Sequence, residues 1–224
     1  MLEIVKTADG SNTIFNSEVG EHYHSKHGAA QESRHVFIQA GLSYFLENNS
    51  AATSLSILEV GFGTGLNFLL SADYCQQNKI AMGYVGIEAY PLSPEMIMTT
   101  GYGQYLSAET WKLFNENYSQ ALQATAELNN DCKLQIANCK LQEYQSDRQF
   151  DIIYFDAFAS ARQPEMWDEA AIGHTVQFLK PGGVFVTYAI TGNLKRALRA
   201  LGCKVEKAPG APGKREMLRA VKMG

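Results

Sequence analysis

The segment Glu59–Asn67 has the sequence Glu-Val-Gly-Phe-Gly-Thr-Gly-Leu-Asn and directly follows a strand-length apolar run. Glycine lets the backbone approach a ligand and adopt dihedrals that a Cβ forbids. A buried strand that runs into such a turn and then into a helix is a common place for a nucleoside cofactor. NAD is the rival cofactor, although its sites usually have the spacing G-x-G-x-x-G and not G-x-G-x-G. The loop residues predicted to bind the cofactor are Glu59, Gly61, Phe62, Gly63, Thr64, Gly65 and Asn67.

Glu88 ends the next apolar run, in Gly86–Pro91. A carboxylate at the carboxyl end of a strand can accept hydrogen bonds from vicinal ribose hydroxyls. A purely structural interpretation is also open: the glycines could make only a tight turn, and Glu88 could cap the segment after it. The order of loop and acid on consecutive strands favours the cofactor.

Asp156 follows the apolar strand Asp151–Phe155 and is flanked by aromatic residues. Catalytic groups of open α/β sheets gather at the carboxyl edge of the strands, so Asp156 is the candidate catalytic residue. The alternative role is a helix N-cap. Phe158 could stack on an extruded base or fill the core, and Trp167 is more typical of core.

The elements that must position these residues follow an alternating pattern. From Leu55, strand-length apolar runs alternate with longer helical segments, which indicates βαβ units and a mostly parallel sheet. Strands are expected at Ser56–Val60, Gly83–Glu88, Lys133–Ala137, Asp151–Phe155 and Gly183–Tyr188. Helices are expected at Leu66–Gln77, Pro94–Thr100, Ala108–Leu128, Glu165–Leu179 and Gly192–Leu201. The stretches Lys204–Lys207 and Glu216–Val221 flank a Pro/Gly-rich loop and predict a closing antiparallel hairpin.

The first residues predict a small extension of the same domain. Leu2–Phe15 alternates around Asp9-Gly10 and indicates two short strands, and Asn16–Gly28 is irregular. Glu32–Asn48 has helical spacing. Residues 1–53 are therefore assigned to an N-terminal extension and 54–224 to the main α/β unit.

Composition limits the function further. The chain has 224 residues, 46% of them hydrophobic, which suits one α/β domain. There is no signal-peptide pattern and no apolar stretch of about 20 residues, so a cytoplasmic protein is expected. The four cysteines are scattered and indicate neither zinc nor disulfides. His22, His24 and His27 lack a partnering thiol or carboxylate pattern, so a polar lid is favoured over a metal site and no metal is expected.

The charge is divided unevenly along the chain. Residues 1–190 carry 10 Lys/Arg and 21 Asp/Glu, a balance of −11, and residues 191–224 carry 9 and 2, a balance of +7. A basic C-terminal part favours a localised anionic partner, although a solvated basic face would give the same numbers. Lys214 and Arg215 follow the Pro/Gly turn and are the candidates to contact phosphates.

The glycine loop with the preceding Glu59 resembles motif I of class I S-adenosylmethionine methyltransferases, which have a Rossmann-like fold. The turn Leu179–Gly183 and the closing hairpin resemble that family more than a dehydrogenase. The resemblance implies S-adenosylmethionine as the cofactor. It also implies that Asn138 takes the place of an Asp that accepts from the adenine amino group, as a neutral and weaker acceptor.

The stretch Asp156–Trp167 resembles the D-G-F-A-P-x-x-x-P-x-M-W segment of the methyltransferase domain of the MnmC family, with Ala157 and Ser160 in place of the usual Gly and Pro. The resemblance runs from about Phe15 to the C-terminus and covers no flavin-dependent oxidase, so the chain looks like the stand-alone form sometimes called MnmD. It implies methyl transfer to the amine of 5-aminomethyl(-2-thio)uridine at the tRNA wobble position. A separate oxidase or upstream tRNA-modifying enzymes would supply the substrate. Alternatives are a methyltransferase or aminopropyltransferase-like enzyme acting on a small amine, and a non-catalytic RNA-binding relative.

Overall fold

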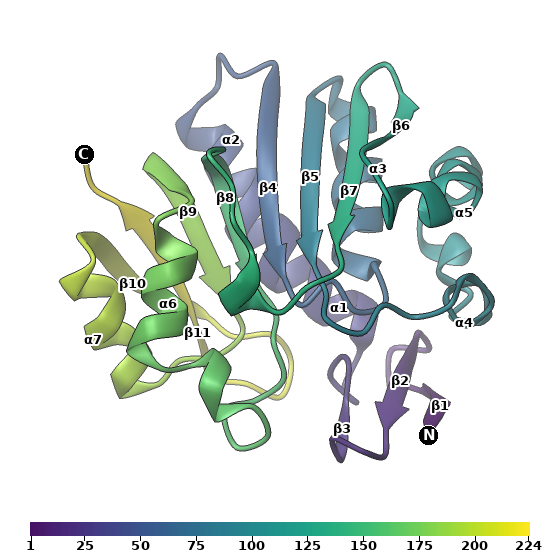
Figure 1. Ribbon diagram of the computed structural model, residues 1–224, viewed down its shortest axis with the longest axis horizontal. Coiled ribbons are helices and arrows are strands. Elements are labelled where there is room, and N and C mark those ends of the chain that lie inside the picture. Colours follow the sequence, from purple (N-terminus) through teal and green to yellow (C-terminus); the bar gives the residue numbers. More distant parts are fainter.

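The computed structural model describes residues 1–224 and contains one eight-stranded sheet with the order β10-β11-β9-β8-β4-β5-β7-β6 (Figure 1). Its strands are β4 (Ser54–Val60), β5 (Ala81–Ile87), β6 (Ala126–Asn129), β7 (Cys132–Ala137), β8 (Phe150–Phe155), β9 (Leu179–Thr187), β10 (Cys203–Pro209) and β11 (Glu216–Lys222). The central five, β7, β5, β4, β8 and β9, are parallel, and β11 joins β9 antiparallel. The predicted mostly parallel sheet with a closing antiparallel hairpin is confirmed.

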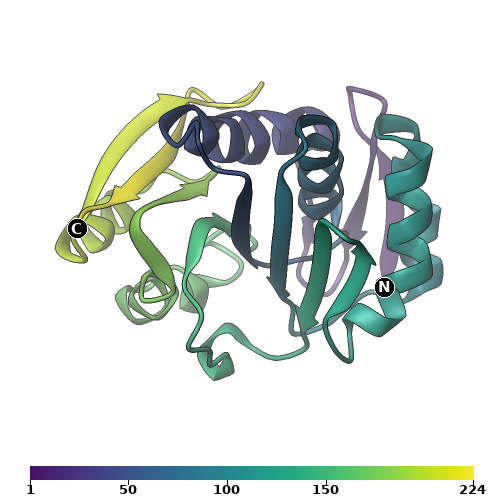
Figure 2. The ribbon, with the colours of Figure 1, turned by 90° about the horizontal axis from the view of Figure 1, so that it is seen from above.

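Helices cover both faces of this sheet (Figure 2). Successive residues of a strand point to opposite faces, and Ile57 and Leu58 accordingly belong to two different core clusters. The Ile57 side is covered by α3 (Leu66–Asn78), α5 (Ala108–Ala121) and the helix of the N-terminal part. The Leu58 side is covered by α6 (Glu169–Val176) and α7 (Gly192–Ala200). The remaining short helices are α4 (Pro94–Thr99), η2 (Tyr102–Tyr105), η3 (Leu141–Glu143) and η4 (Pro164–Met166).

The N-terminal part forms a second, three-stranded antiparallel sheet of β1 (Leu2–Lys6), β2 (Asn12–Asn16) and β3 (Glu21–His22). The hairpin turn at Asp9-Gly10 is confirmed, with Gly10 at φ +87°. β3 lies in the segment that was predicted to be irregular.

The predicted helix Glu32–Asn48 is present but is not a uniform α-helix. It consists of α1 (Ala29–Ser33), the π-helical η1 (Arg34–Ser43) and α2 (Tyr44–Asn48) in unbroken succession. A π-helical stretch of this length is rare, and periodicity in the sequence does not reveal it.

Two predicted helices were too long. The helix from Ala108 ends at Ala121, and Ala126–Asn129 forms β6, in which buried and exposed residues alternate. The second helix begins at Glu169 and ends at Val176, so that Leu179 already opens β9. None of the helices combines the length and apolar composition needed to cross a membrane.

Candidate active site

Four of the predicted site residues lie at the carboxyl edge of the parallel strands. Gly61 follows β4, Glu88 follows β5, Asn138 follows β7 and Asp156 follows β8. The chain runs outward from β4 through β5 to β7 and then returns to β8 on the other side of β4. A reversal of this kind leaves a crevice at the strand ends, where ligands of open α/β sheets bind.

The glycine loop touches the backbone around Asp156. Gly61 has φ +84°, and a Cβ there would lie 2.6 Å from the carbonyl oxygen of Asp156. The Asp156 N–H in turn donates to the carbonyl of Val60 at 2.8 Å. Only glycine at position 61 therefore lets the loop after β4 and the chain after β8 pack so closely.

Glu88 holds the same loop from the other side. Its Oε2 accepts the N–H of Gly63 at 2.9 Å, and its Oε1 accepts the N–H of Tyr90 at 3.0 Å. Each carboxylate oxygen has a further lone pair and can still accept from a hydroxyl. The structural and ligand-binding interpretations of Glu88 are thus compatible.

The side chains of Glu59, Phe62 and Thr64, three residues predicted to bind the cofactor, lie in the protein interior. All three residues are buried, with exposed fractions of 0%, 3% and 0%. The Glu59 carboxylate accepts from Asn67 Nδ2 at 2.7 Å and from the Tyr84 hydroxyl at 2.8 Å, and burial raises its pKa well above the ordinary value. These side chains support the loop from within the protein, and cofactor binding by the three residues stays a prediction.

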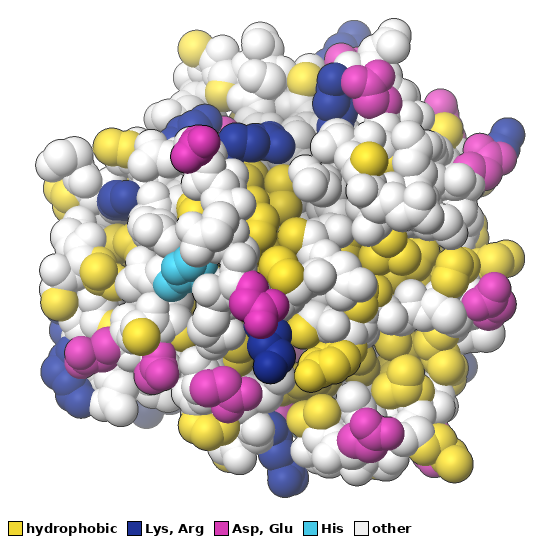
Figure 3. Space-filling view, viewed as in Figure 1, with side chains coloured by type: hydrophobic (Ala, Val, Ile, Leu, Met, Phe, Trp, Pro, Cys, Tyr) yellow, Lys and Arg dark blue, Asp and Glu magenta, His cyan; other side chains and the backbone are white.

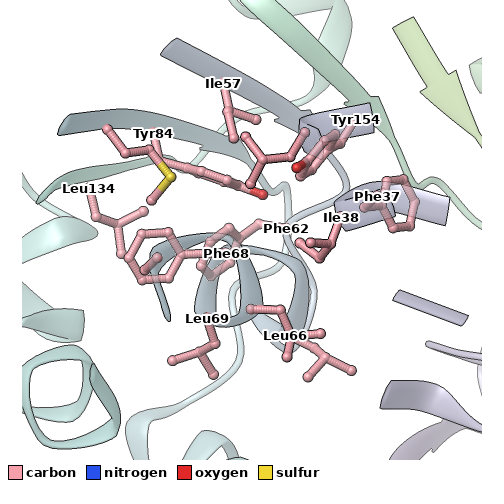
Figure 4. Packing of buried hydrophobic residues seen from close by; sticks show 14 of the residues in the cluster. Phe37, Ile38, Ile57, Phe62, Leu66, Phe68, Leu69, Tyr84, Leu134 and Tyr154 are labelled. Carbon is pink, nitrogen blue, oxygen red and sulfur yellow. The ribbon is translucent and has the colours of Figure 1, made fainter. Parts of the chain in front are cut away.

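Phe62 shows the same arrangement in the core. Figure 4 shows its ring beside Phe68 and close to Tyr84, between α3 and the sheet. Gly86 on β5 lies against this ring, and a Cβ at Gly86 would overlap it. The loop therefore offers its backbone, and not the Phe62 side chain, to the crevice.

Asn67 connects two carboxyl groups. Its Nδ2 donates both to Glu59 Oε1 and, at 2.8 Å, to Asp156 Oδ2. Its Oδ1 is buried and has no hydrogen-bond partner within the protein. An unpaired buried acceptor is costly, so this oxygen is suited to a donor from a bound molecule.

Asp156 has an environment that strongly alters its acidity. Burial, followed by the nearby Glu32 carboxylate, raises its pKa to about 7, while the Asn67 hydrogen bond and the Lys214 ammonium oppose the change. Asp156 is not a helix N-cap, because α6 is capped by Asp168, which accepts the Ala171 N–H at 2.7 Å. A carboxyl group that titrates near neutral pH can exchange a proton during a reaction.

The segment from β3 onward, in which a polar lid was expected at His22, His24 and His27, covers the glycine loop through Tyr23, which the sequence did not single out. The Tyr23 ring occupies the space beside Gly63, where a Cβ would come within 2.9 Å of it. It also packs edge-on against Phe158, with ring centroids 5.1 Å apart. Glu21 accepts the N–H of Ala159 at 3.1 Å. These contacts join the N-terminal sheet to the loop after β8.

Phe158 and Trp167 have different surroundings. Phe158 is partly exposed beside Tyr23 and stays a candidate for substrate contact. Trp167 is 8% exposed and packs on Phe155, with its Nε1 donating to the Phe158 carbonyl at 2.8 Å. Trp167 is thus a core residue, as predicted.

The three clustered histidines separate in the structure. His24 Nε2 lies 2.8 Å from Thr64 Oγ1, and burial lowers its pKa to about 4. His22 packs on Phe15, and His27 lies against Gly213. No group of three or more His, Cys, Asp or Glu side chains is placed to hold a metal ion.

Lys214 lies in the loop between β10 and β11, as expected, and its side chain turns toward α1. Its ammonium is 2.7 Å from Glu32 Oε1 and 3.9 Å above the Tyr188 ring, inside the site. The Lys214 ammonium thus has a partner within the protein, and phosphate contact by Lys214 stays a prediction. Arg215 is exposed and has no ion-pair partner. It remains a candidate for phosphate contact.

A family model described as S-adenosyl-L-methionine-dependent methyltransferase matches residues 106–223. The chain belongs to this methyltransferase family. The cofactor expected at the glycine loop is therefore S-adenosylmethionine, and the alternatives of an NAD site and a non-catalytic relative are wrong.

Individual relatives agree with this assignment. The tRNA 5-methylaminomethyl-2-thiouridine biosynthesis bifunctional protein MnmC of Leptospira borgpetersenii is 30% identical over 208 residues, which are 88% of this chain and 31% of that protein. The protein of the same name from Idiomarina loihiensis is 32% identical over 209 residues, 88% of this chain and 34% of its own. The chain thus spans about a third of the length of these curated relatives.

Solved structures show the same fold. The crystal structure of MNMC2 from Aquifex aeolicus superposes with a TM-score of 0.77 at 24% identity, covering 98% of this chain and 70% of that one. Spermidine synthase from Thermotoga maritima gives a TM-score of 0.58 at 15% identity, and the match covers 99% of this chain and 68% of the spermidine synthase chain. The fold is the Rossmann-like fold of class I methyltransferases.

The residues at the strand ends fit the cofactor of this methyltransferase family. Glu88 has free lone pairs for ribose hydroxyls, and the exposed Asn138 lies at the end of β7, one strand further out, where an adenine acceptor was predicted. The unpaired Asn67 Oδ1 offers an acceptor to an amino group such as that of the cofactor's methionine part. The loop and its neighbours thus include hydrogen-bond acceptors suited to the ribose hydroxyls, the adenine amino group and the methionine amino group.

Proposed function

We propose that this chain transfers a methyl group to the primary amine of 5-aminomethyl(-2-thio)uridine at the wobble position of tRNA, giving the 5-methylaminomethyl product. The observation that carries the proposal is the position of Asp156, which lies against the glycine loop with a pKa raised to about 7. The names of the MnmC relatives supply the acceptor, since those proteins take part in 5-methylaminomethyl-2-thiouridine synthesis on tRNA.

The chemistry requires that the acceptor amine loses a proton. S-adenosylmethionine supplies a methyl group on a sulfonium sulfur. The amine nitrogen forms the new N–C bond while the S–C bond breaks, and a protonated amine cannot attack because it has no lone pair. Asp156 would hold the incoming ammonium and take its proton, directly or through a water. A carboxylate with a pKa near 7 accepts this proton more readily than one at 3.8 by roughly 4 kcal/mol.

The other groups align the reaction. Asn67 fixes one oxygen of Asp156 at 2.8 Å, which leaves the second oxygen for the amine. Phe158 and Tyr23 together offer an aromatic surface on which an extruded uracil could stack. Correct placement of the nitrogen opposite the methyl group should contribute most of the rate enhancement.

Binding of tRNA would use local basic residues, because the face in Figure 3 carries Lys, Arg and acidic side chains intermixed. Four of the nine basic residues after Ile190 pair with acidic side chains: Lys204, Lys207, Lys214 and Arg219. Arg196, at the middle of α7, and Arg215, in the β10–β11 loop, are exposed. β11 runs antiparallel to β9, so Arg215 lies at the same sheet edge as Asp156. α7 begins near that edge at Gly192, and Arg196 lies about one turn further along the helix. Arg196 and Arg215 are the proposed phosphate contacts.

The decisive experiment offers the purified chain S-adenosylmethionine with three acceptors in parallel. These are tRNA from cells that lack the last methylation, the free 5-aminomethyluridine nucleoside, and polyamines. Mass spectrometry of the digested tRNA should show conversion to the methylaminomethyl nucleoside, with little transfer to the other two. Preference for the polyamines would instead favour a small-amine enzyme, and the Asp156→Asn variant controls for contaminating activity. A separate oxidase or upstream tRNA-modifying enzymes would then have to generate the primary amine on tRNA.

A further inference from the structure

An ion pair between Glu32 and Lys214 joins the N-terminal part to the β10–β11 loop beside Asp156. Glu32 of α1 and Lys214 of the β10–β11 loop are 182 positions apart in the chain, and Glu32 Oε1 is 2.7 Å from Lys214 Nζ. Glu32 is only 8% exposed, and its second oxygen accepts the Ser25 N–H at 2.9 Å. A charged group buried to this extent loses hydration, which the pairing and the backbone donor only partly replace. Its place beside the candidate catalytic carboxylate suggests a functional reason for its burial.

The pair is linked to Asp156 by contacts. The Lys214 ammonium lies 3.9 Å above the Tyr188 ring, and the Tyr188 hydroxyl donates to the carbonyl of Ala157, the residue after Asp156, at 2.9 Å. Glu32 raises the pKa of Asp156, and Lys214 lowers it. The titratable groups facing Asp156 are Glu32 from α1, Glu59 from β4, Tyr84 from β5, Tyr188 after β9 and Lys214 from the β10–β11 loop.

We infer that Glu32 and Lys214 are positioning residues for Asp156, which together set the charge that an acceptor ammonium meets and close the site between α1 and the β10–β11 loop. The inference rests on the proposed function, because it assumes that Asp156 takes a proton from an amine.

The Lys214 ammonium and the Glu32 carboxylate affect the protonation of Asp156 in opposite directions. Without Lys214, two neighbouring carboxyl groups would repel each other and retain a proton, so Asp156 would be neutral when the substrate arrives. Without Glu32, the Lys214 ammonium would be free to pair with Asp156 and would weaken its affinity for the substrate proton. With both present, two carboxylates and one ammonium leave a net charge of −1, which an acceptor ammonium neutralises.

The first test measures Asp156 itself and needs no substrate. In protein labelled with ¹³C at the aspartate carboxyl carbons, the Asp156 signal is identified by its loss in Asp156→Asn and is titrated by NMR. We expect a wild-type midpoint near 7. The midpoint should rise by about one unit in Lys214→Met and fall by about one unit in Glu32→Gln. Lys214→Arg keeps the charge and should titrate like the wild type.

Lys207→Met is the matched control. Lys207 pairs with Glu216 at 3.3 Å on the same hairpin, and the pair is exposed. This variant should leave the Asp156 midpoint unchanged. Thermal unfolding of each variant shows that it is folded; if Lys214→Met does not fold, the comparison of Glu32→Gln with the wild type and with Lys214→Arg still decides the sign.

The second test follows the methyl-transfer rate against pH. The acid limb of kcat/KM should move in the same directions as the NMR midpoints. Unchanged Asp156 midpoints, or shifts in the same direction for Lys214→Met and Glu32→Gln, would overturn the inference. The ion pair would then serve only to hold the β10–β11 loop against α1. If wild-type protein does not methylate the tRNA amine, the proposed function fails, while the NMR midpoints still report whether the pair sets the charge of Asp156.

Discussion

Gly61→Ala should damage both the stability and the methyl-transfer activity of the protein. The residue has φ +84°, and an alanine Cβ would lie 2.6 Å from the Asp156 carbonyl oxygen and 3.0 Å from its carbonyl carbon. The left-handed conformation costs a non-glycine residue about 1–2 kcal/mol, and forced overpacking adds about 1–3 kcal/mol. The sum of about 2–5 kcal/mol corresponds to a fall in Tm of roughly 4–20 °C for a chain of this size.

Gly182→Ala separates the two contributions. Gly182 has a similar φ of +77°, but nothing lies within 4 Å of a Cβ built there. This variant should therefore lose only about 1–2 kcal/mol and keep its methyl-transfer rate. Urea unfolding gives the free energy for both variants, and single-turnover kinetics gives the rate. Equal stability losses and equal rates for the two variants would refute the close contact between the glycine loop and Asp156.

Three further predictions concern other parts of the site. Asp156→Asn should keep the affinity for S-adenosylmethionine, measured by titration calorimetry, and lower the single-turnover rate by about 10²–10⁴-fold; a comparable loss of affinity would make Asp156 a cofactor ligand. His24 has a pKa lowered from 6.5 to about 4, so its contribution to stability is present above pH 6.5 and is lost as the pH falls toward 4. In the His24→Gln variant, the free energy of unfolding measured with urea should fall by up to roughly 3 kcal/mol less than in the wild type between pH 6.5 and 4. The same loss in both proteins would exclude His24 as its source. Changing Arg196 and Arg215 together to Ala should reduce the log–log salt slope of tRNA binding by roughly 0.7–0.9 per lost phosphate contact, with wild-type slope as the contrary result.

The parts of the site that local sequence specifies were predictable. The glycine loop, Glu88 and Asp156 each follow a buried strand, and the carboxyl ends of parallel strands must meet at one edge. The closing hairpin was predictable for the same reason, because a Pro/Gly-rich turn separates two strand-length segments. In these cases a residue's neighbours in the chain determine its place.

Other features depend on contacts between distant segments, which no local pattern contains. The π-helical turns of η1, the position of Tyr23 over Gly63 and the pairing of Glu32 with Lys214 belong to this group. Glu59 also belongs to it, because its place in the motif does not show that Asn67 and Tyr84 use its carboxylate inside the core. A motif thus predicts which loop binds but not which of its side chains face the ligand.

The residues specified by local sequence and those placed by contacts between distant segments also differ in their expected effect on the reaction. The glycine loop and Asp156 are joined through backbone at Gly61, so they form a rigid unit for bringing a methyl group next to a carboxylate. The walls around that unit come from the segment Glu21–Glu32 and the β10–β11 loop, which meet through Lys214 and through His27 against Gly213. These walls contribute an aromatic surface and a balanced charge, and in the proposed function both act on the acceptor. A change of acceptor should therefore require substitutions in these two segments, whereas substitutions in the glycine loop should affect every acceptor alike.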